Sequence, residues 1–316
     1  MAYTKEEFKQ LVDDIQSQSW YKNPVGFGIA RVDRGQINKD KILQATFPLI
    51  NWNENFGSAA VLLNALKVAG VDVDTSKSEL VAKISDEFLT SCIEAFRPFI
   101  PEAKGDAHKN VQVISTLASL PIDSGLSADD YRVVFIFEDV TPESTEAVYL
   151  KLYALSTGKA ALRSLNLTGA FGKLHNCAWV GNQPIELDWL RANEIVLKLS
   201  GKYPNIDMVD KFPRFLQHII PADNTRILET SKVRMGAQLA AGTTVMPGAA
   251  YVNFNAGTLG AVMVEGRISS SAVVGAGSDV GGGASILGVL SGTDGVPVSI
   301  GENTLLGANS CTGTAI

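Results

Sequence analysis

Aliphatic residues recur every six positions through the last third of the chain. The first run contains Ile227, Val233, Leu239, Val245 and Tyr251; the register resumes with Val262, Ile268, Val274, Val280 and Ile286, and again with Ile300 and Leu306. A period of six fits neither an α-helix nor an ordinary strand, and internal repeats of this kind indicate a solenoid. Three hexapeptides make one coil of a three-sided prism, with aliphatic side chains inside and Gly, Ala, Ser or Asn at the corners.

The pattern therefore predicts a parallel β-helix, and hexapeptide coils of this type wind left-handed, against the usual crossover rule. Two interruptions of the repeat, near Asn253 to Leu259 and near Leu290 to Val298, predict loops that leave the prism. Loops on a rigid scaffold are frequent places for function.

The first two thirds of the chain show a different pattern. Thr4 and Glu7 have the spacing of a capping box, followed by apolar residues at helical intervals. The remaining signals are helices at 57–69 and 77–96, a buried strand at Tyr131 to Phe137, and a helix that begins after Thr141 with Pro142 in its first turn and ends at Gly158. Helix and strand signals alternate up to about residue 200, so this part is expected to be an α/β domain.

Composition changes where the repeat begins. Residues 227–316 hold 17 of the 29 glycines but only 8 of the 60 charged residues. We therefore expect two domains, an α/β domain over 1–220 and a β-helix domain over 221–316.

Charge and composition exclude several classes of function. The formal net charge is −6 and no block of Lys and Arg offers a footprint for nucleic acid. The uncharged stretch between Arg234 and Glu265 carries Gly, Thr, Asn and Pro throughout, which argues against a membrane span. The start of the chain has no apolar core typical of a secretory signal, and three widely spaced cysteines suit reduced thiols, so a cytoplasmic protein is expected.

Hexapeptide prisms occur in acyltransferases, in one class of carbonic anhydrase and in non-catalytic solenoids, so the fold alone does not decide the function. The three histidines, His108, His175 and His218, all lie outside the repeat. A zinc site with three His ligands and a histidine base within the prism are therefore both excluded. Any base in the repeat must be a carboxylate, and the candidates are Glu229, Glu265, Asp279, Asp294 and Glu302.

Glu265 stands out among these acids because it ends the long uncharged stretch and is followed by Arg267. An alternative interpretation is a solvated corner residue that forms a surface ion pair with this arginine.

Several segments resemble the tetrahydrodipicolinate N-succinyltransferase family. They are GAQLAAGTTVM, the long segment VNFNAGTLGAVMVEGRISSSAVVGAGSDVGGGASILGVLSG, the later LLGANS, and the upstream YLKLYALS and VDKFPR. The resemblance runs from about residue 149 to the end of the chain. It implies transfer of a succinyl group from succinyl-CoA to the amino group of ring-opened tetrahydrodipicolinate, in lysine and diaminopimelate synthesis. It also implies a homotrimer with active sites between neighbouring prisms.

The resemblance also assigns residues. The acid of the VEGR motif, here Glu265, is the catalytic residue of the family, and Arg267 of the same motif contacts the acyl donor. Further ligand contacts fall on Gly282, Ser285 and Ala308. The flanking glycines of VGGGAS, Gly281 and Gly283, are more simply explained as corner residues.

Glu265 suits the implied chemistry because an amine attacks a thioester only when it is neutral. A carboxylate can remove the amine's proton, particularly where burial raises its pKa. Attack of the same carboxylate on the thioester, to give an acyl-anhydride, is an alternative. Arg267 offers a planar fork for a carboxylate of the donor or the acceptor.

The sequence departs from the family in two places. Some members hold magnesium with an Asp and a Glu, where this chain has Ser231 and the apolar segment MPGAAY, so no metal and no tightly bound cofactor are expected. The chain also stops at Ile316, inside a continuing coil, whereas the family has further coils that contribute to the coenzyme A site; the β-helix is therefore expected to be truncated at its carboxyl end. Two other functions stay open at this point, an acetyl-CoA-dependent acyltransferase and a non-catalytic solenoid.

Overall fold

The computed structural model describes residues 4–120, 128–288 and 296–312. The chain forms two compact units. Unit 1 contains Met1–Leu150 and Leu167–Lys173, and unit 2 contains Lys151–Asn166 and Leu174–Ile316. Residues 174–220 therefore share a unit with the repeat. The domain boundary expected at residue 220, where the repeat pattern begins, stays a prediction.

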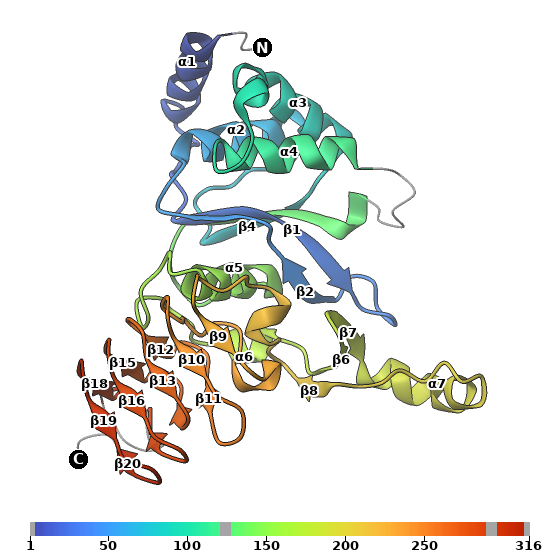
Figure 1. Ribbon diagram of the computed structural model, residues 1–316. Coiled ribbons are helices and arrows are strands. Elements are labelled where there is room, and N and C mark those ends of the chain that lie inside the picture. Colours follow the sequence, from blue (N-terminus) through green and yellow to red (C-terminus); the bar gives the residue numbers. More distant parts are fainter. Residues whose placement is uncertain (1–3, 121–127, 289–295, 313–316) are drawn as a thin grey trace. The chain divides into compact units, whose positions relative to one another are not determined.

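Unit 1 is an antiparallel sheet covered by helices (Figure 1), which confirms the predicted α/β character of this part. The strands follow the order β2-β1-β5-β4, and β3 also pairs with β1. The strands are β1 (Gly26–Arg34), β2 (Ile42–Thr46), β3 (Ile50–Trp52), β4 (Glu79–Lys83) and β5 (Tyr131–Ile136). The helices are α1 (Lys5–Gln16), α2 (Phe56–Val68), α3 (Asp86–Phe96), α4 (Lys109–Ser119) and α6 (Ala170–Lys173), with the first half of α5 (Thr145–Ser156).

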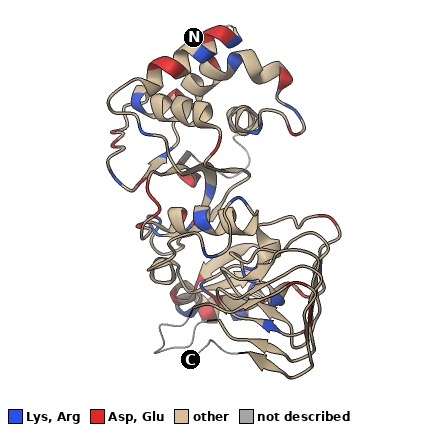
Figure 2. Ribbon diagram, turned by 90° about the vertical axis from the view of Figure 1, so that its left-hand side faces the viewer, with Lys and Arg blue, Asp and Glu red and all other residues tan. Residues whose placement is uncertain are grey.

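Alternation along the strands directs one set of apolar side chains to the helices. Phe27 and Ile29 of β1, with Val133 and Phe135 of β5, share one buried cluster with apolar residues of α1 to α4. Charged residues are frequent on these helices and sparse on the coils of unit 2 (Figure 2). Within the described ranges, no helix is both long and apolar enough to cross a membrane.

The element predictions for this part are confirmed except at two places. The capping box of Thr4 and Glu7 begins α1, as predicted. The predicted helix over 77–96 is wrong in its first half, because residues 79–83 pair with β5 as a strand and the Ser85 hydroxyl caps a helix that begins at Asp86. The helix predicted from Thr141 begins at Thr145 instead, because the Ser144 hydroxyl accepts the hydrogen bond from the Ala147 N–H.

Unit 2 begins with a small antiparallel sheet. Its strands are β6 (Cys177–Val180), β7 (Gln183–Glu186) and β8 (Met208–Asp210), in the order β7-β6-β8, and α7 (Leu187–Leu199) connects β7 to β8. The second half of α5 also belongs to this unit.

The repeat forms three parallel sheets of very short strands, which the chain visits in turn (Figure 1). The first coil contains β10 (Thr244–Val245), β11 (Tyr251–Val252) and β12 (Gly257–Thr258), and the second β13 (Met263–Val264), β14 (Arg267–Ile268) and β15 (Val273–Val274). The third contains β16 (Asp279–Val280), β17 (Ser285–Ile286) and β18 (Ser299–Ile300), and the fourth β19 (Leu305–Leu306) and β20 (Cys311–Thr312); β9 (Arg226–Ile227) precedes them.

We call the three sheets the first face (β9, β10, β13, β16, β19), the second face (β11, β14, β17, β20) and the third face (β12, β15, β18). The second residue of each strand points inward; Val252, Ile268 and Ile286, for example, are completely buried on the second face. The predicted three-sided parallel solenoid is therefore present in the described residues.

The repeat register differs from the prediction in the first two coils. The inward residues are Val252 and Val264, where the sequence pattern favoured Tyr251 and Val262. One additional residue after Val245 shifts the inward positions later in the sequence, and a shortened corner after Val264 shifts them back. The predicted register is therefore correct from Ile268 onward. Residues 253–259 stay within the coil, so the loop predicted there is wrong. Most of the second predicted loop lies outside the described residues.

One arginine connects three successive coils. Arg163, in the segment after α5, has a left-handed backbone conformation with φ of 68°. Its backbone N–H donates to Asn255 Oδ1 at 2.8 Å, and its Nε donates to the Ser271 carbonyl at 2.6 Å. Its two terminal nitrogens donate to the Val298 carbonyl and the Ser299 hydroxyl at 2.6 and 2.9 Å.

Candidate active site

The VEGR motif forms a shortened corner between the first and second faces. In the second coil the inward residue Ile268 follows Val264 after only four positions. In the third coil Ile286 follows Val280 after the usual six positions. Gly266 is required in this tight corner, because a Cβ atom there would lie 2.3 Å from the Ala284 carbonyl oxygen. The short corner holds Glu265 against the next coil, through a hydrogen bond of 2.9 Å from its N–H to the Val280 carbonyl.

The Glu265 carboxylate is half-buried and has no hydrogen-bond or ion-pair partner among the described residues. Its Oε2 atom lies 3.6 Å from the position that a Cβ atom would occupy on Gly282. A carboxylate that has no partner in the protein and faces a bare backbone is available to a ligand.

Arg267 does not neutralise this carboxylate. Its Nε and Nη2 atoms both donate to the Ser285 hydroxyl, at 3.0 and 2.5 Å. These two residues face each other across the parallel pair β14 and β17. The alternative interpretation of Glu265 and Arg267 as a surface ion pair is therefore wrong for the described conformation.

The glycines of the VGGGAS motif have different surroundings. A Cβ on Gly281 would lie 2.5 Å from the Leu306 carbonyl oxygen, and Gly283 has φ of +72° with its Cβ position 2.4 Å from Asn309 Oδ1. Gly282 has no such conflict, since its nearest neighbour is the Glu265 carboxylate. The geometry therefore supports a corner role for Gly281 and Gly283, and leaves room beside Gly282 for a ligand.

Ala308 lies one coil further along the same corner. The Asn309 N–H, next to it in sequence, donates to the Gly282 carbonyl at 3.0 Å. Thus the five predicted site residues lie on three successive coils, with Glu265 and Arg267 on the second, Gly282 and Ser285 on the third and Ala308 on the fourth. Of the other acids considered, Glu302 is exposed, Asp279 lies on the first face, and Asp294 lies outside the described residues.

The motif VDKFPR contains a buried charge cluster whose role the sequence did not reveal. Asp210 accepts hydrogen bonds from Arg214 Nη1 at 2.8 Å and from Arg234 Nε at 3.0 Å, and its side chain is 11% exposed. Burial alone would raise the pKa of Asp210, but the hydrogen bond from Arg214 and the charges of Arg234 and Arg214 outweigh it, and the pKa lies below its ordinary value. Asp210 thereby ties β8 to the beginning of the repeat. Arg214 lies four residues after Asp210, but Arg234 lies 24 residues away, so the sequence gave no sign that the two arginines share this carboxylate.

The positions that hold magnesium in some family members have other partners here. The Ser231 hydroxyl hydrogen-bonds to the Glu229 carboxylate, and the segment PGAAY directly after Met246 contains no acidic residue. In the described parts of the chain, no group of three or more His, Cys, Asp and Glu is arranged to hold a metal ion.

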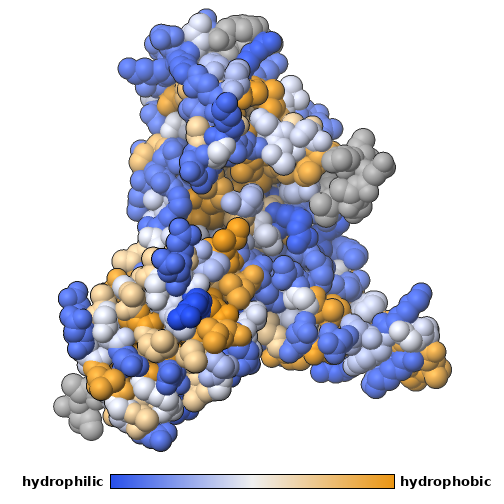
Figure 3. Space-filling view, in the orientation of Figure 1, coloured by the Kyte–Doolittle hydropathy of each residue, from blue (hydrophilic) through white to orange (hydrophobic). Residues whose placement is uncertain are grey.

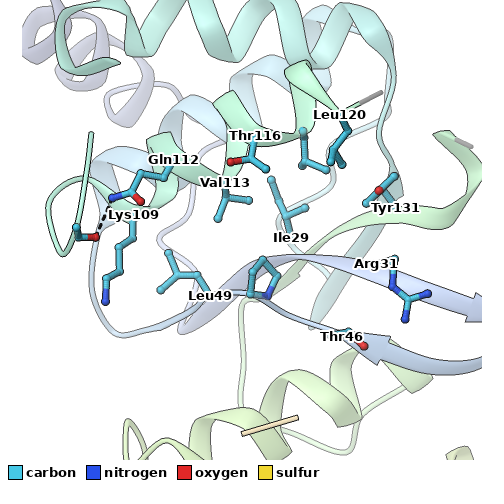
Figure 4. Close-up of a pocket in the computed structure, with 13 residues that line it drawn as sticks. Ile29, Arg31, Thr46, Leu49, Lys109, Gln112, Val113, Thr116, Leu120 and Tyr131 are labelled. Carbon is cyan, nitrogen blue, oxygen red and sulfur yellow. Dashed lines mark hydrogen bonds between the residues drawn. The ribbon is translucent and has the colours of Figure 1, made fainter. Parts of the chain in front are cut away.

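Unit 1 contains a separate cavity of about 530 Å³ between α4 and the sheet (Figure 4). Its walls are mainly apolar, with Ile29 and Leu49 facing Val113 of α4, and Lys109 and Arg31 lie at its two ends. Arg31 is held by both oxygens of Asp33, at 2.7 and 2.9 Å. No carboxylate is among its described lining residues, and none of the predicted site residues belongs to it.

Comparison with known proteins extends the resemblance to the amino-terminal part. The profile described as "Tetrahydrodipicolinate N-succinyltransferase N-terminal" matches residues 6–172, and the one for the middle region of the same family matches residues 174–214. The family match therefore begins well before residue 149, where the resemblance of the quoted motifs starts.

Similar proteins span nearly the whole chain. The 2,3,4,5-tetrahydropyridine-2,6-dicarboxylate N-succinyltransferase of Sulfurovum sp. is 70% identical over 98% of this chain and 77% of its own length, and that of Nitratiruptor sp. is 68% identical over 99% and 79%. A Campylobacter jejuni crystal structure, provisionally named a 2,3,4,5-tetrahydropyridine-2-carboxylate N-succinyltransferase, superimposes with a TM-score of 0.94 at 59% identity, over 99% of this chain and 80% of that one. The chain thus belongs to the tetrahydrodipicolinate N-succinyltransferase family.

Proposed function

We propose that this protein transfers the succinyl group of succinyl-CoA to the amino group of ring-opened tetrahydrodipicolinate. The family and the full-length relatives support this reaction. The observation that carries it at the site is the half-buried Glu265 carboxylate beside Gly282, which has no partner among the described residues. The neighbouring Arg267 pairs with no carboxylate of those residues either.

In this reaction the Glu265 carboxylate takes a proton from the acceptor's ammonium group, and the neutral amine attacks the thioester carbonyl. Glu265 releases this first proton to solvent, and the nitrogen loses a second proton as the C–N bond forms and the C–S bond breaks. The second proton passes to the departing coenzyme A sulfur, so the products are one amide, one thiol and one proton. In the covalent alternative the carboxylate itself attacks first and the amine then cleaves the anhydride. Both routes need Glu265 without a partner in the resting protein.

Arg267 is suited to bind a carboxylate. Ser285 occupies its Nε and Nη2 atoms with one hydroxyl oxygen, while no acid holds the guanidinium within the described residues. The exposed guanidinium can therefore bind a carboxylate of the succinyl group or of the acceptor. We assign Gly282, Ser285 and Ala308 to the donor site as well, because they continue along the prism from Glu265 and have small side chains.

The coils are further proposed to wind left-handed and to assemble as a homotrimer. The six-residue period and the family support the handedness. Exposed apolar residues on unit 2 support assembly: Ile220, Leu259 and Leu228 are 94%, 62% and 52% exposed. Hydrophobic residues cover much of the visible face of the coils (Figure 3). Light scattering should give three times the chain mass, and a fully active monomer would contradict this assembly.

A cytoplasmic location is part of the proposal. It is supported by three cysteines that all carry free thiols, one of them exposed.

The direct test of the function is thiol release from succinyl-CoA, measured with and without the acceptor. We expect release to require the acceptor and to be slower with acetyl-CoA. Release that ignores the acceptor, or that proceeds equally well with acetyl-CoA, would contradict the proposed reaction.

A further inference from the structure

The candidate site occupies two parallel columns of the prism. The corner column contains Glu265, Gly282 and Ala308, one residue from each of the second, third and fourth coils. The second-face column contains Arg267 and Ser285 from the second and third coils. Parallel pairing aligns Ser285 with Cys311 on the fourth coil, so this column has a third position.

The side chain of Cys311 shares its orientation with those of Arg267 and Ser285. Each of these residues is the first of a two-residue strand whose second residue follows it on the opposite side. Ile268 and Ile286 are completely buried inside the prism, so Arg267 and Ser285 point outward. Cys311 has the same place in β20 and is exposed.

We propose that Cys311 is a further residue of the acyl-CoA donor site, completing a surface of two columns and three coils. This inference rests on the proposed function. Neighbouring strands lie about 4.8 Å apart, so Cys311 is about 10 Å along the prism from Arg267. The donor contacts on Gly282, Ser285 and Ala308 run in this direction, away from Glu265. A donor whose thioester lies at Glu265 therefore extends over the fourth coil and covers the Cys311 thiol.

Small side chains along this path support the inference. Gly282, Ala308 and Cys311 have no side chain or a small one, so an extended coenzyme arm can lie close to the coils there. Ser285 is 6% exposed, and its hydroxyl is held by Arg267. The corresponding outward position on the first face of the fourth coil is Leu305, which is large and 73% exposed. On the fourth coil, the second face therefore carries a small outward residue where the first face carries a large one.

The thiol itself provides the first test, on the unmodified protein. Cys92 and Cys177 are buried, and burial raises the pKa of the Cys92 thiol, so Cys311 should be the cysteine that iodoacetamide alkylates in the native protein. The probe is S-(3-carboxypropyl)-coenzyme A, a thioether analogue of succinyl-CoA with no free thiol and no acyl group to transfer. We expect saturating analogue to slow alkylation of Cys311, followed by mass spectrometry, about tenfold or more. Unchanged alkylation while calorimetry shows the analogue bound would overturn the proposal.

A pair of matched variants provides the second test. Cys311→Trp should raise the KM for succinyl-CoA about tenfold or more, with a smaller effect on kcat, because bulk there competes with the donor and not with the chemistry. Leu305→Trp places the same bulk on the same coil but on the first face, and should leave both constants nearly unchanged. Equal behaviour of the two variants would refute the role of Cys311.

The outcomes separate this inference from the proposed function. If the wild-type protein turns over succinyl-CoA and Glu265→Gln does not, while Cys311 remains unprotected, the function stands and the donor path over the fourth coil is wrong. If the analogue fails to bind, both the donor assignment and the role of Cys311 are wrong.

Discussion

Glu265→Gln should lower kcat by at least about a hundredfold and leave donor affinity nearly unchanged. A positioned base contributes roughly a hundred to ten thousandfold in rate, and a nucleophilic carboxylate contributes more. Gln retains the size of the side chain and removes only the basic oxygen. Because the carboxylate has no partner among the described residues, the substitution breaks no interaction of the resting protein. Thiol release gives kcat, and calorimetry with the thioether analogue gives donor affinity.

Glu302→Gln is the control for this prediction. Glu302 is an exposed corner acid of the same repeat with no assigned role, and its variant should resemble the wild type. If both variants lose activity equally, or if Glu265→Gln lowers the melting temperature instead of the turnover, Glu265 is a structural residue.

Asp210→Asn should destabilise the protein by about 2 kcal/mol, because it leaves two half-buried arginines without their carboxylate. Arg214 and Arg234 have side chains that are 13% and 22% exposed, so water replaces the lost partner only in part. Urea unfolding at neutral pH measures the change. Asp188→Asn is the matched control: Asp188 pairs with Arg191 at 2.5 Å, but both side chains are mainly exposed, and such pairs contribute about 1 kcal/mol or less.

The effect of Asp210 also depends on pH in a defined direction. The pKa of Asp210 in the folded protein lies below the ordinary value of 3.8, so the folded state favours the ionised form. The stabilisation is fully present above this ordinary value and is lost as the pH falls through the lower, folded-state value. The wild type and Asp210→Asn should therefore converge in stability at acid pH. A constant difference at every pH would show that packing, and not charge, explains the effect.

The sequence alone was sufficient to predict the solenoid, and it also indicated a candidate site, which stays a prediction. A six-residue period leaves few alternatives, and the acid of VEGR is conspicuous after 30 uncharged positions, residues 235–264. The local phase was harder to predict, because Val262, Met263 and Val264 are all apolar and each could point inward. Only pairing with Val280 on the next coil selects Val264. The shortened corner that holds Glu265 was therefore not visible in the pattern.

Interactions between distant segments were not predictable for the same reason. Asp210, Arg214 and Arg234 are ordinary charged residues in the sequence, and only the fold brings β8 beside the first repeat. The local pattern predicts helix at residues 79–83, because the strand's partner β5 lies about fifty residues away in the sequence. Local propensity is a weak guide where a distant strand provides the hydrogen bonds.

The contacts of Arg163 change how the solenoid can come apart. In a stack of repeats each coil normally interacts only with its immediate neighbours, and the ends can fray one coil at a time. Arg163 bonds to Asn255, Ser271 and Val298, which belong to the first, second and third coils. A single residue therefore couples coils that are not adjacent, and opening the third coil disturbs a side chain that also anchors the second. We therefore expect the first, second and third coils to unfold as one cooperative segment, and this segment includes the coils of Glu265 and Ser285 but not that of Ala308.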